Sequence, residues 1–201
     1  MSGFGGWARL VCGTCCALLI SACCFPGSVK PTVKVGLSAP FEGRYRDLGY
    51  EVLYAVRLAV RQRNEAGGIG DQYLVELVAL NDFAEAGPAV VQAQKMGVDD
   101  GILGVLGGLA PETAVAAAPE YERIGLAFLH PGADLTQVPS GSRDVPFKAE
   151  YLALSGGVPP GEAARWAYAA VNRLLDAMDV DAMNESSPSR RGVEQLLLED
   201  W

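Results

Sequence analysis

The chain has 201 residues, half of them hydrophobic, and a formal net charge of −8. This length suggests one domain or at most two, and the body from Pro31 onward is long enough to build a hydrophobic core. The acidic balance argues against a nucleic-acid-binding protein, which would carry a basic surface. Arg9 is the only charged residue of 1–22, so removal of that segment would leave a body of about −9.

The amino terminus has the pattern of an export signal. Residues 1–22 contain no acid, and Arg9 precedes an apolar run that ends at Ile20. This run is too short to span a membrane as a helix, which needs roughly 20 residues. A Ser-Ala pair precedes Cys23, and small residues before a cysteine are typical of cleavage and lipid attachment in a bacterial lipoprotein. We expect a lipoprotein signal peptide over 1–22, lipidation at Cys23 and a tether over 23–32.

Two other interpretations of this segment remain open. In an ordinary secretory signal the cysteines would be incidental. A disulfide or metal role is disfavoured because all five cysteines lie within residues 12–24. Cleavage would leave only Cys23 and Cys24, so the folded part is predicted to contain no disulfide.

The body alternates between short apolar runs and amphipathic stretches. The apolar runs predict strands at 33–37, 73–80, 101–106 and 126–129. The intervening stretches predict helices at 48–65 and 86–98 and a third that begins at Pro111. This alternation requires a parallel sheet.

The first predicted helix has an apolar stripe and ends at a Gly67-Gly68 stop. Arg57, Arg61 and Arg63 fall mostly off that stripe, so we interpret them as a solvated face. The glycines follow a helix, which identifies them as a helix stop and not as a phosphate-binding loop.

Two glycine-containing turns follow the third and fourth predicted strands. The first follows Gly107-Gly108 and spans 109–113, where Pro111 suits the first turn of a helix and Glu112 is placed favourably for the helix dipole. The second spans 131–134. Both would leave the carboxyl ends of parallel strands, where open α/β sheets place their binding sites, so we expect the functional site there.

The carboxyl-terminal third is predicted to be mostly helical. Residues 162–178 predict a helix whose broad apolar stripe we interpret as core and not as a cofactor site. The polar stretch 179–191 predicts a loop, and 193–201 predicts a short final helix. The stripe consists of Ala163, Trp166, Ala167, Ala170, Val171, Leu174, Leu175 and Met178.

Several short motifs follow one another along the chain. They are residues 33–43 (Val-Lys-Val-Gly-Leu-Ser-Ala-Pro-Phe-Glu-Gly), residues 64–70 (Asn-Glu-Ala-Gly-Gly-Ile-Gly) and then the two turns. Together they resemble the amino-terminal lobe of the leucine/isoleucine/valine-binding family of type I periplasmic solute-binding proteins. The resemblance covers most of 33–138. It implies an α/β fold with three αβα layers around a mainly parallel sheet.

The segments 147–160 and 167–177 resemble the part of these receptors that returns to the first lobe after the second lobe is complete. The family often has Asp where this chain has Ala169. Too few residues separate the two parts of this chain to form a second lobe. We therefore interpret 33–201 as a single lobe, made of a first part, 33–138, and a returning segment, 147–201.

The resemblance also implies a ligand site. In the family, the turn after the third strand offers backbone amides and a hydroxyl to the ligand's carboxylate at a helix amino terminus. Pro111 stands where a serine is usual and lacks both the hydroxyl and the amide hydrogen. Only Thr113 retains a hydroxyl, and Glu112 adds a negative charge. The matching residues are Leu109, Ala110, Pro111, Glu112 and Thr113.

In the second turn, Gly132 falls where a backbone carbonyl commonly receives the ligand's ammonium, and Asp134 falls where a threonine commonly binds. Glu112 and Asp134 together would favour a cationic or amine-rich solute over a zwitterion. The alternative is that both acids cap helices or face water.

The resemblance implies an extracytoplasmic solute-binding lipoprotein of an ABC-type importer, lipid-anchored in the bacterial envelope, for an amino acid or a related amine or amide. Its expected partners are the solute, the permease and a second copy of the chain. A single lobe offers half of the wall that usually buries a small ligand, so we expect reduced affinity. The alternative function is a non-transporting remnant, or a partner or sensor domain that keeps only the fold.

The sequence does not favour an enzyme. His130 is the only histidine, and a catalytic role would need partners within hydrogen-bond reach. We find no nucleophile elbow, phosphate loop, metal-spaced His/Cys set or dinucleotide fingerprint, so no cofactor and no metal are expected. A flavodoxin-like enzyme would need a phosphate-binding loop of this kind.

Overall fold

The computed structural model describes residues 30–131, 144–185 and 187–199. The predicted signal peptide, Cys23 and most of the tether lie outside the described residues, as do Gly132 and Asp134. The chain divides into a unit over 1–30 and a unit over 31–201, and all described helices and strands belong to the second.

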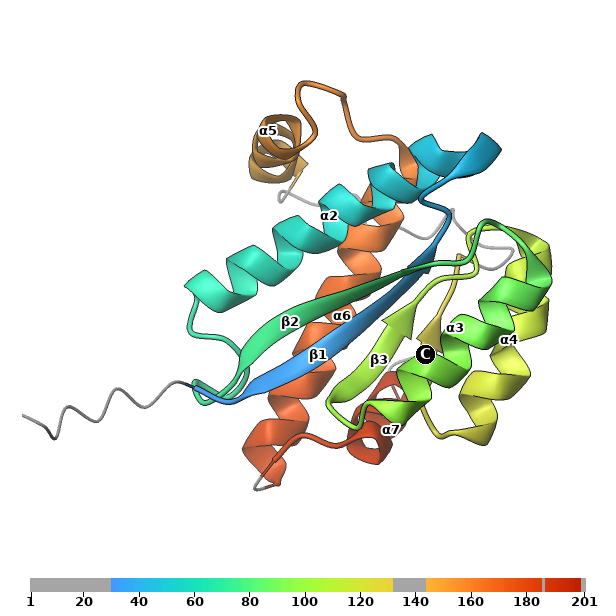
Figure 1. Ribbon diagram of the computed structural model, residues 1–201. Helices are drawn as coiled ribbons and strands as arrows, with labels where there is room; N and C mark the ends of the chain where they lie inside the picture. Colours follow the sequence, from blue (N-terminus) through green and yellow to red (C-terminus); the bar gives the residue numbers. More distant parts are fainter. Residues whose placement is uncertain (1–29, 132–143, 186, 200–201) are drawn as a thin grey trace, which may run out of the picture. The chain divides into compact units, whose positions relative to one another are not determined.

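A four-stranded sheet lies at the centre of this unit, with the order β2-β1-β3-β4 (Figure 1). β1 pairs along its whole length with β2 and on its other side with β3, and every pairing is parallel. The parallel sheet predicted from the alternating pattern is confirmed. Its strands are β1 (Thr32–Ala39), β2 (Leu74–Asn81), β3 (Ile102–Leu106) and β4 (Ala127–Leu129).

Helices cover both faces of the sheet, which confirms the three-layer αβα architecture (Figure 1). One face carries α3 (Ala86–Val98) and α4 (Pro111–Arg123). The other carries α2 (Arg46–Glu65), α6 (Glu162–Asn184) and α7 (Arg190–Glu199), and α5 (Asp144–Leu154) packs against α2. A short 3-10 helix, η2 (Gly43–Tyr45), leads into α2.

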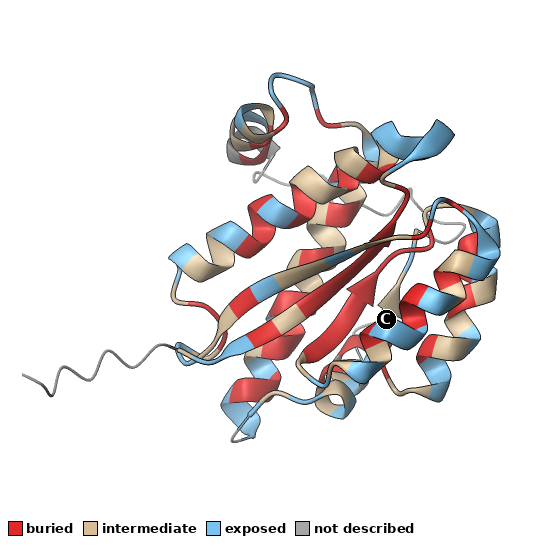
Figure 2. Cartoon of the chain, viewed as in Figure 1, coloured by how far each residue is buried: buried red, intermediate tan, exposed pale blue. Residues whose placement is uncertain are grey.

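The core is densest around the two central strands (Figure 2). All of β3 is buried, including Gly104. A Cβ at Gly104 would lie 2.5 Å from Cδ1 of Leu174, so the glycine permits α6 to lie close against the sheet. The prediction that the α6 stripe is core is confirmed in its central members, which are completely buried: Ala167, Val171, Leu174, Leu175 and Met178.

The predicted loop at 179–191 is wrong at both ends, which are helical, while the connection between the two helices lies within it. α6 continues to Asn184 and α7 begins at Arg190, three residues before the predicted final helix. The polar residues that suggested a loop make tertiary hydrogen bonds. Asp181 is 5% exposed, and its carboxylate accepts hydrogen bonds from the amide and hydroxyl of Ser189. Polar side chains that find such tertiary partners do not interrupt a helix.

The arginines of α2 are only partly a solvated face. Arg57 and Arg61 are exposed, as predicted, but the side chain of Arg63 is 17% exposed. It pairs with Asp176 and with Asp179, whose Oδ2 lies 3.6 Å from Nη1 of Arg63. The prediction failed for Arg63 because α6 lies beside α2 and presents acidic residues to it.

Candidate functional site at the carboxyl edge

The four parallel strands end at one side of the sheet, which we call the carboxyl edge and define by residues 40–45, 82–85, 107–113 and 130–131. The loops from β1 and β3 leave neighbouring strands and pass to opposite faces, toward α2 and α4. Open α/β sheets bind ligands outside the strand ends, at the point where neighbouring connections diverge in this way. The fold therefore has the kind of edge on which the site was predicted, and the site itself stays a prediction.

The Gly107-Gly108 turn positions the start of α4 at this edge. The Gly107 amide donates to the Leu129 carbonyl at 3.0 Å, and a Cβ on Gly107 would lie 2.9 Å from the Ser38 carbonyl oxygen. Gly108 has a φ of +64°, and a Cβ there would lie 2.8 Å from the Ala114 Cβ. Glycine is required at both positions because β1 and α4 leave no room for a side chain.

The five residues predicted from the first turn lie together at the amino terminus of α4. Pro111 occupies the first turn, and Pro111 and Glu112 are both exposed. Leu109 and Ala110 are partly buried. Thr113 is 1% exposed, and its hydroxyl donates to the Ala110 carbonyl at 2.8 Å. The hydroxyl of Thr113 therefore stabilises the start of the helix, while Glu112 is the charged group that faces solvent.

His130 lies at the end of β4, where it is exposed. Its ring centroid is 5.4 Å from that of Phe128, which in turn stacks on Tyr121 at 4.4 Å. This aromatic contact places His130 at the carboxyl edge. Gly132 and Asp134 follow it outside the described residues, so their place beside Glu112 remains a prediction.

A buried polar pair that the sequence analysis missed lies directly below this edge. The Ser38 hydroxyl donates to Asp82 Oδ2 at 3.1 Å, and the two residues are 3% and 1% exposed. The Ala84 amide donates to Asp82 Oδ1 at 2.9 Å. Burial raises the pKa of the Asp82 carboxyl, and the bonds from Ala84 and Ser38 oppose that rise. The pair fixes the loop after β2 to the end of β1.

Asn81 reinforces the same connection from the neighbouring position. Its Oδ1 accepts hydrogen bonds from the amides of Phe41 and Phe83, both at 3.0 Å. Phe83 and Ala84 each have a φ of +57°, which is uncommon for residues other than glycine. The Asn-Asp pair at the end of a strand was the sequence signal for this structure, because these residues commonly bind the backbone of a following turn.

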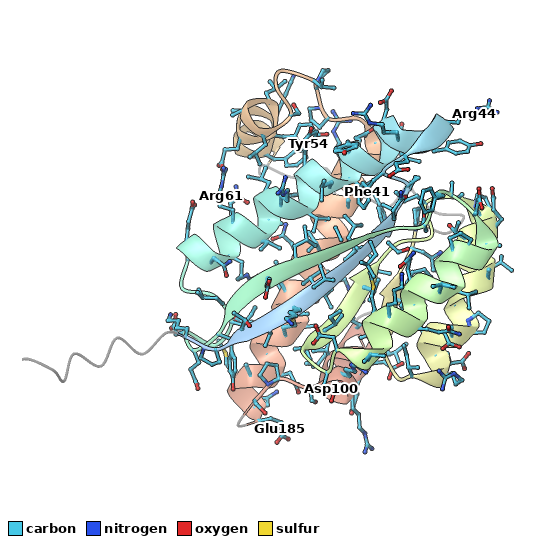
Figure 3. The ribbon with its side chains drawn as sticks, viewed as in Figure 1. Phe41, Arg44, Tyr54, Arg61, Asp100 and Glu185 are labelled. Carbon is cyan, nitrogen blue, oxygen red and sulfur yellow. The ribbon has the colours of Figure 1, made fainter. Side chains whose placement is uncertain are left out.

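Arginine and tyrosine side chains form a rim on the α2 side of the edge (Figure 3). The Arg44 guanidinium lies 5.7 Å from the Tyr45 ring centroid, and that of Arg46 lies 5.2 Å from the Tyr50 centroid. The Tyr50 ring also meets Phe41 edge-on at 5.8 Å. The alternation Arg-Tyr-Arg at 44–46 signals this rim in the sequence, and it offers cation–π and stacking contacts to a bound molecule.

The groups of the carboxyl edge are polar, charged and aromatic. In the described part of the chain, no group of three or more His, Cys, Asp or Glu residues could hold a metal ion. No helix formed by the described residues is long and apolar enough to cross a membrane. Exposed charges, aromatic rings and helix-terminal amides are the groups that this edge presents.

Comparison with known proteins gives a consistent result. The family described as periplasmic binding protein matches residues 32–174. The leucine-specific-binding protein of Salmonella typhimurium is 32% identical over 114 residues, which are 55% of this chain and 30% of that protein. A leucine-, isoleucine-, valine-, threonine- and alanine-binding protein of Pseudomonas aeruginosa is 29% identical over 109 residues, 54% of this chain and 29% of that protein. The chain thus spans less than a third of the length of these relatives.

A solved structure shows the same fold. The branched-chain amino acid transporter substrate-binding protein LivJ from Streptococcus pneumoniae, in complex with isoleucine, superposes with a TM-score of 0.69. The match covers 83% of this chain and 87% of that chain, at 12% sequence identity. At this identity the likeness concerns the fold alone.

Proposed function

Because the chain belongs to the periplasmic binding protein family, we propose that it is an extracytoplasmic solute-binding protein whose ligand lies at the carboxyl edge. The observation that carries this proposal is the extent of the family match, which includes all four strands, the Gly107-Gly108 turn and most of α6. Backbone and side-chain groups of the turn then lie where parallel α/β sheets bind small molecules.

The proposed ligand is an amino acid or a related amine or amide. The relatives named above bind leucine and similar amino acids. In this chain, Pro111 lacks an amide hydrogen and Thr113 is buried, so the turn is poorer in donors for a carboxylate. Exposed Glu112, with Asp134 on the second turn, instead favours a cationic or amine-rich solute.

The proposed setting is an ABC-type importer, with the chain anchored to the membrane through a lipid on Cys23. The described residues build one lobe, which forms one wall of a binding cleft. A ligand that stays open to water exchanges its hydrogen bonds with solvent, so affinity in the millimolar range, roughly −4 kcal/mol, is expected for the monomer. A homodimer that faces two carboxyl edges toward each other would supply the second wall.

A second candidate is a non-transporting remnant, or a partner or sensor domain that keeps only the fold. The observation in its favour is that the chain covers 29% and 30% of the named relatives. Receptors that close two lobes over a solute bury it by hinge motion, and this requires both lobes.

Thermal unfolding in the presence of a panel of amino acids, amides and polyamines distinguishes these candidates. A ligand that binds the folded state raises the midpoint. We expect a saturable rise with a cationic solute, lost in Asp134→Ala and kept in the control Asp100→Ala, which removes a fully exposed carboxylate elsewhere. A cooperative transition that no solute moves would favour the remnant or partner domain, and micromolar binding by a monomer would contradict the expected weak affinity.

A further inference from the structure

A hollow of about 630 Å³ lies along the outer side of α2, bounded by the edge strand β2 and the last residue of α5. We call it the α2–α5 groove and define it by Tyr54, Arg57, Val60, Arg61, Leu77 and Leu154. Its volume is within the range of roughly 300–1,000 Å³ found for small-molecule sites. None of these residues belongs to the carboxyl edge, so the groove is separate from the site described above.

The walls of the groove are mainly apolar. Val60 is 8% exposed and belongs to the main core. Leu77 on β2 and Leu154 at the end of α5 are partly buried and pack against that core. An apolar chain placed against these three side chains would be removed from water, which favours binding.

The groove also contains an unpaired arginine. Arg61 is paired with two acids, because its Nη2 lies 2.8 Å from Glu150 Oε2 and its Nε lies 3.8 Å from Oε1 of Glu65, which also lines the groove; the two acids balance the charges of Arg61 and Arg57. Arg57, about one turn earlier in α2, makes no hydrogen bond or ion pair with any other residue that the structure describes. This guanidinium is available to an anion although the whole chain is acidic.

Tyr54 supplies a second hydrogen-bond donor next to Arg57. The two are three residues apart on one helix, so their side chains lie on the same face. Within the described residues, the Tyr54 hydroxyl has no hydrogen-bond partner, while its ring meets that of Tyr151 edge-on at 6.2 Å. Tyr54 and Arg61 lie on the side of α2 that faces α5 (Figure 3).

The groove is formed before any ligand arrives, because α5 is fixed to its neighbours. The Tyr151 hydroxyl donates to the Glu51 carbonyl at 3.1 Å, and the Phe147 ring lies 4.5 Å from that of Tyr168 on α6. The Arg61–Glu150 pair adds a third connection. A preformed site reduces the ordering cost of binding.

We propose that the α2–α5 groove binds a linear aliphatic carboxylate. Arg57 and the Tyr54 hydroxyl donate to the carboxylate, a charge-assisted contact that arginine makes in bidentate form. The aliphatic chain lies against Val60, Leu77 and Leu154. This second site does not depend on the solute at the carboxyl edge.

Calorimetric titration of the full chain with decanoate, with decanol as the uncharged match, tests this proposal. We expect decanoate to bind about tenfold more tightly than decanol, which corresponds to one charge-assisted contact. Arg57→Gln removes this difference, and Tyr54→Phe reduces it. The control Arg191→Gln, which changes an exposed arginine on α7 outside the groove, keeps it.

Several results would overturn the proposal. Decanoate that fails to bind, or that binds no better than decanol, excludes a carboxylate site. An Arg57→Gln variant with unchanged decanoate affinity shows binding elsewhere, for example on the apolar leader. The response to amino acids and amines at the carboxyl edge should be the same in Arg57→Gln, so failure at one site is distinguishable from failure at the other.

Discussion

The two edges of the sheet are held together differently. At the edge where the strands begin, the amino edge, Arg190 donates hydrogen bonds to three backbone carbonyls of a distant segment. At the carboxyl edge, Asn81 and Asp82 connect the loops after β1 and β2. We define the amino edge by residues 32–34, 66–73, 97–102 and 187–190. The segments joined there are some 90 residues apart in sequence. Long-range connections of this kind stabilise the fold.

The two edges also differ in whether their charged side chains are paired. At the amino edge, the Lys34 ammonium pairs with the Asp99 carboxylate at 2.8 Å, and the resulting hydrogen bond lowers the pKa of Asp99. At the carboxyl edge, Glu112 is exposed to solvent and Arg44 lies over a tyrosine ring, as does Arg46 at the adjoining start of α2. The amino edge therefore pairs its charges, whereas the carboxyl edge leaves charged and aromatic groups in contact with solvent, which is the arrangement that our proposed binding site requires.

The largest expected effect is on the amino edge. Arg190 is 18% exposed in its side chain and bonds to the carbonyls of Gly97, Asp99 and Ile102, the shortest at 2.6 Å. Arg190→Ala removes charged donors from three carbonyls, and we expect a loss of about 3 kcal/mol in the free energy of unfolding. Urea unfolding measures it, with the exposed neighbour in Arg191→Ala as control. Equal losses in the two variants would show that Arg190 does not hold this edge together.

The buried pair below the carboxyl edge should have the next largest effect. Ser38→Ala leaves the Asp82 carboxylate without one of its two donors, and we expect a loss of about 2 kcal/mol at neutral pH. Ser187→Ala, at an exposed position, is the control in the same urea experiment. A loss no larger than that of the control would mean that Asp82 does not need the hydroxyl.

A pair of substitutions on one turn separates stability from binding. Thr113→Val removes the hydroxyl that bonds to Ala110, and we expect it to cost about 1 kcal/mol in unfolding without changing the response to solutes. Glu112→Gln should leave stability within about 0.5 kcal/mol because the side chain is exposed. It should, however, weaken the thermal response to cationic solutes. If Thr113→Val weakened the response to solutes and Glu112→Gln did not, the binding group would be Thr113.

The smallest expected effect is a pH dependence that belongs to Asp82. Because burial raises its pKa in the folded protein above the unfolded value of 3.8, the folded state holds this proton more firmly. Stability therefore falls as pH rises from about the unfolded pKa through the folded pKa, and stays constant above it. Relative to the wild type, Asp82→Asn should gain stability over that interval. Urea unfolding between pH 3.5 and 7 checks the trend, and a difference that does not change with pH would contradict it.

The strands and most helices could be predicted because each signal is local. The apolar runs that became β1 and β3 are buried on both faces, and the Gly67-Gly68 stop ends α2 as its position implied. Gly68, with a φ of +86°, lies so close to the Tyr73 carbonyl that a Cβ would meet it at 1.9 Å. A conformational requirement of this kind depends on one residue and its neighbours in the sequence, so it can be predicted from the sequence.

The features that sequence reasoning missed depend on side-chain partners that the local sequence pattern does not reveal. Asp181 continues α6 because Ser189 binds it, and Arg63 is withdrawn from solvent because Asp176 and Asp179 face it from α6. The Ser38–Asp82 pair joins two strands that are 44 residues apart. Of the candidate site, the turn and its place at the carboxyl edge were predictable, whereas the burial of Thr113 followed from the packing of α4.

The central claim is that the carboxyl edge is the binding edge. The most direct test of this claim is amide chemical-shift mapping during titration with L-lysine. With lysine up to about 10 mM, enough to populate a millimolar site, we predict saturable shifts concentrated in residues 39–45 and 107–113, and near-constant resonances in residues 97–101. L-Leucine at the same concentration should give smaller shifts at the same residues. Shifts concentrated at the amino edge, or no saturable shift at residues 107–113 with either amino acid, would contradict the account.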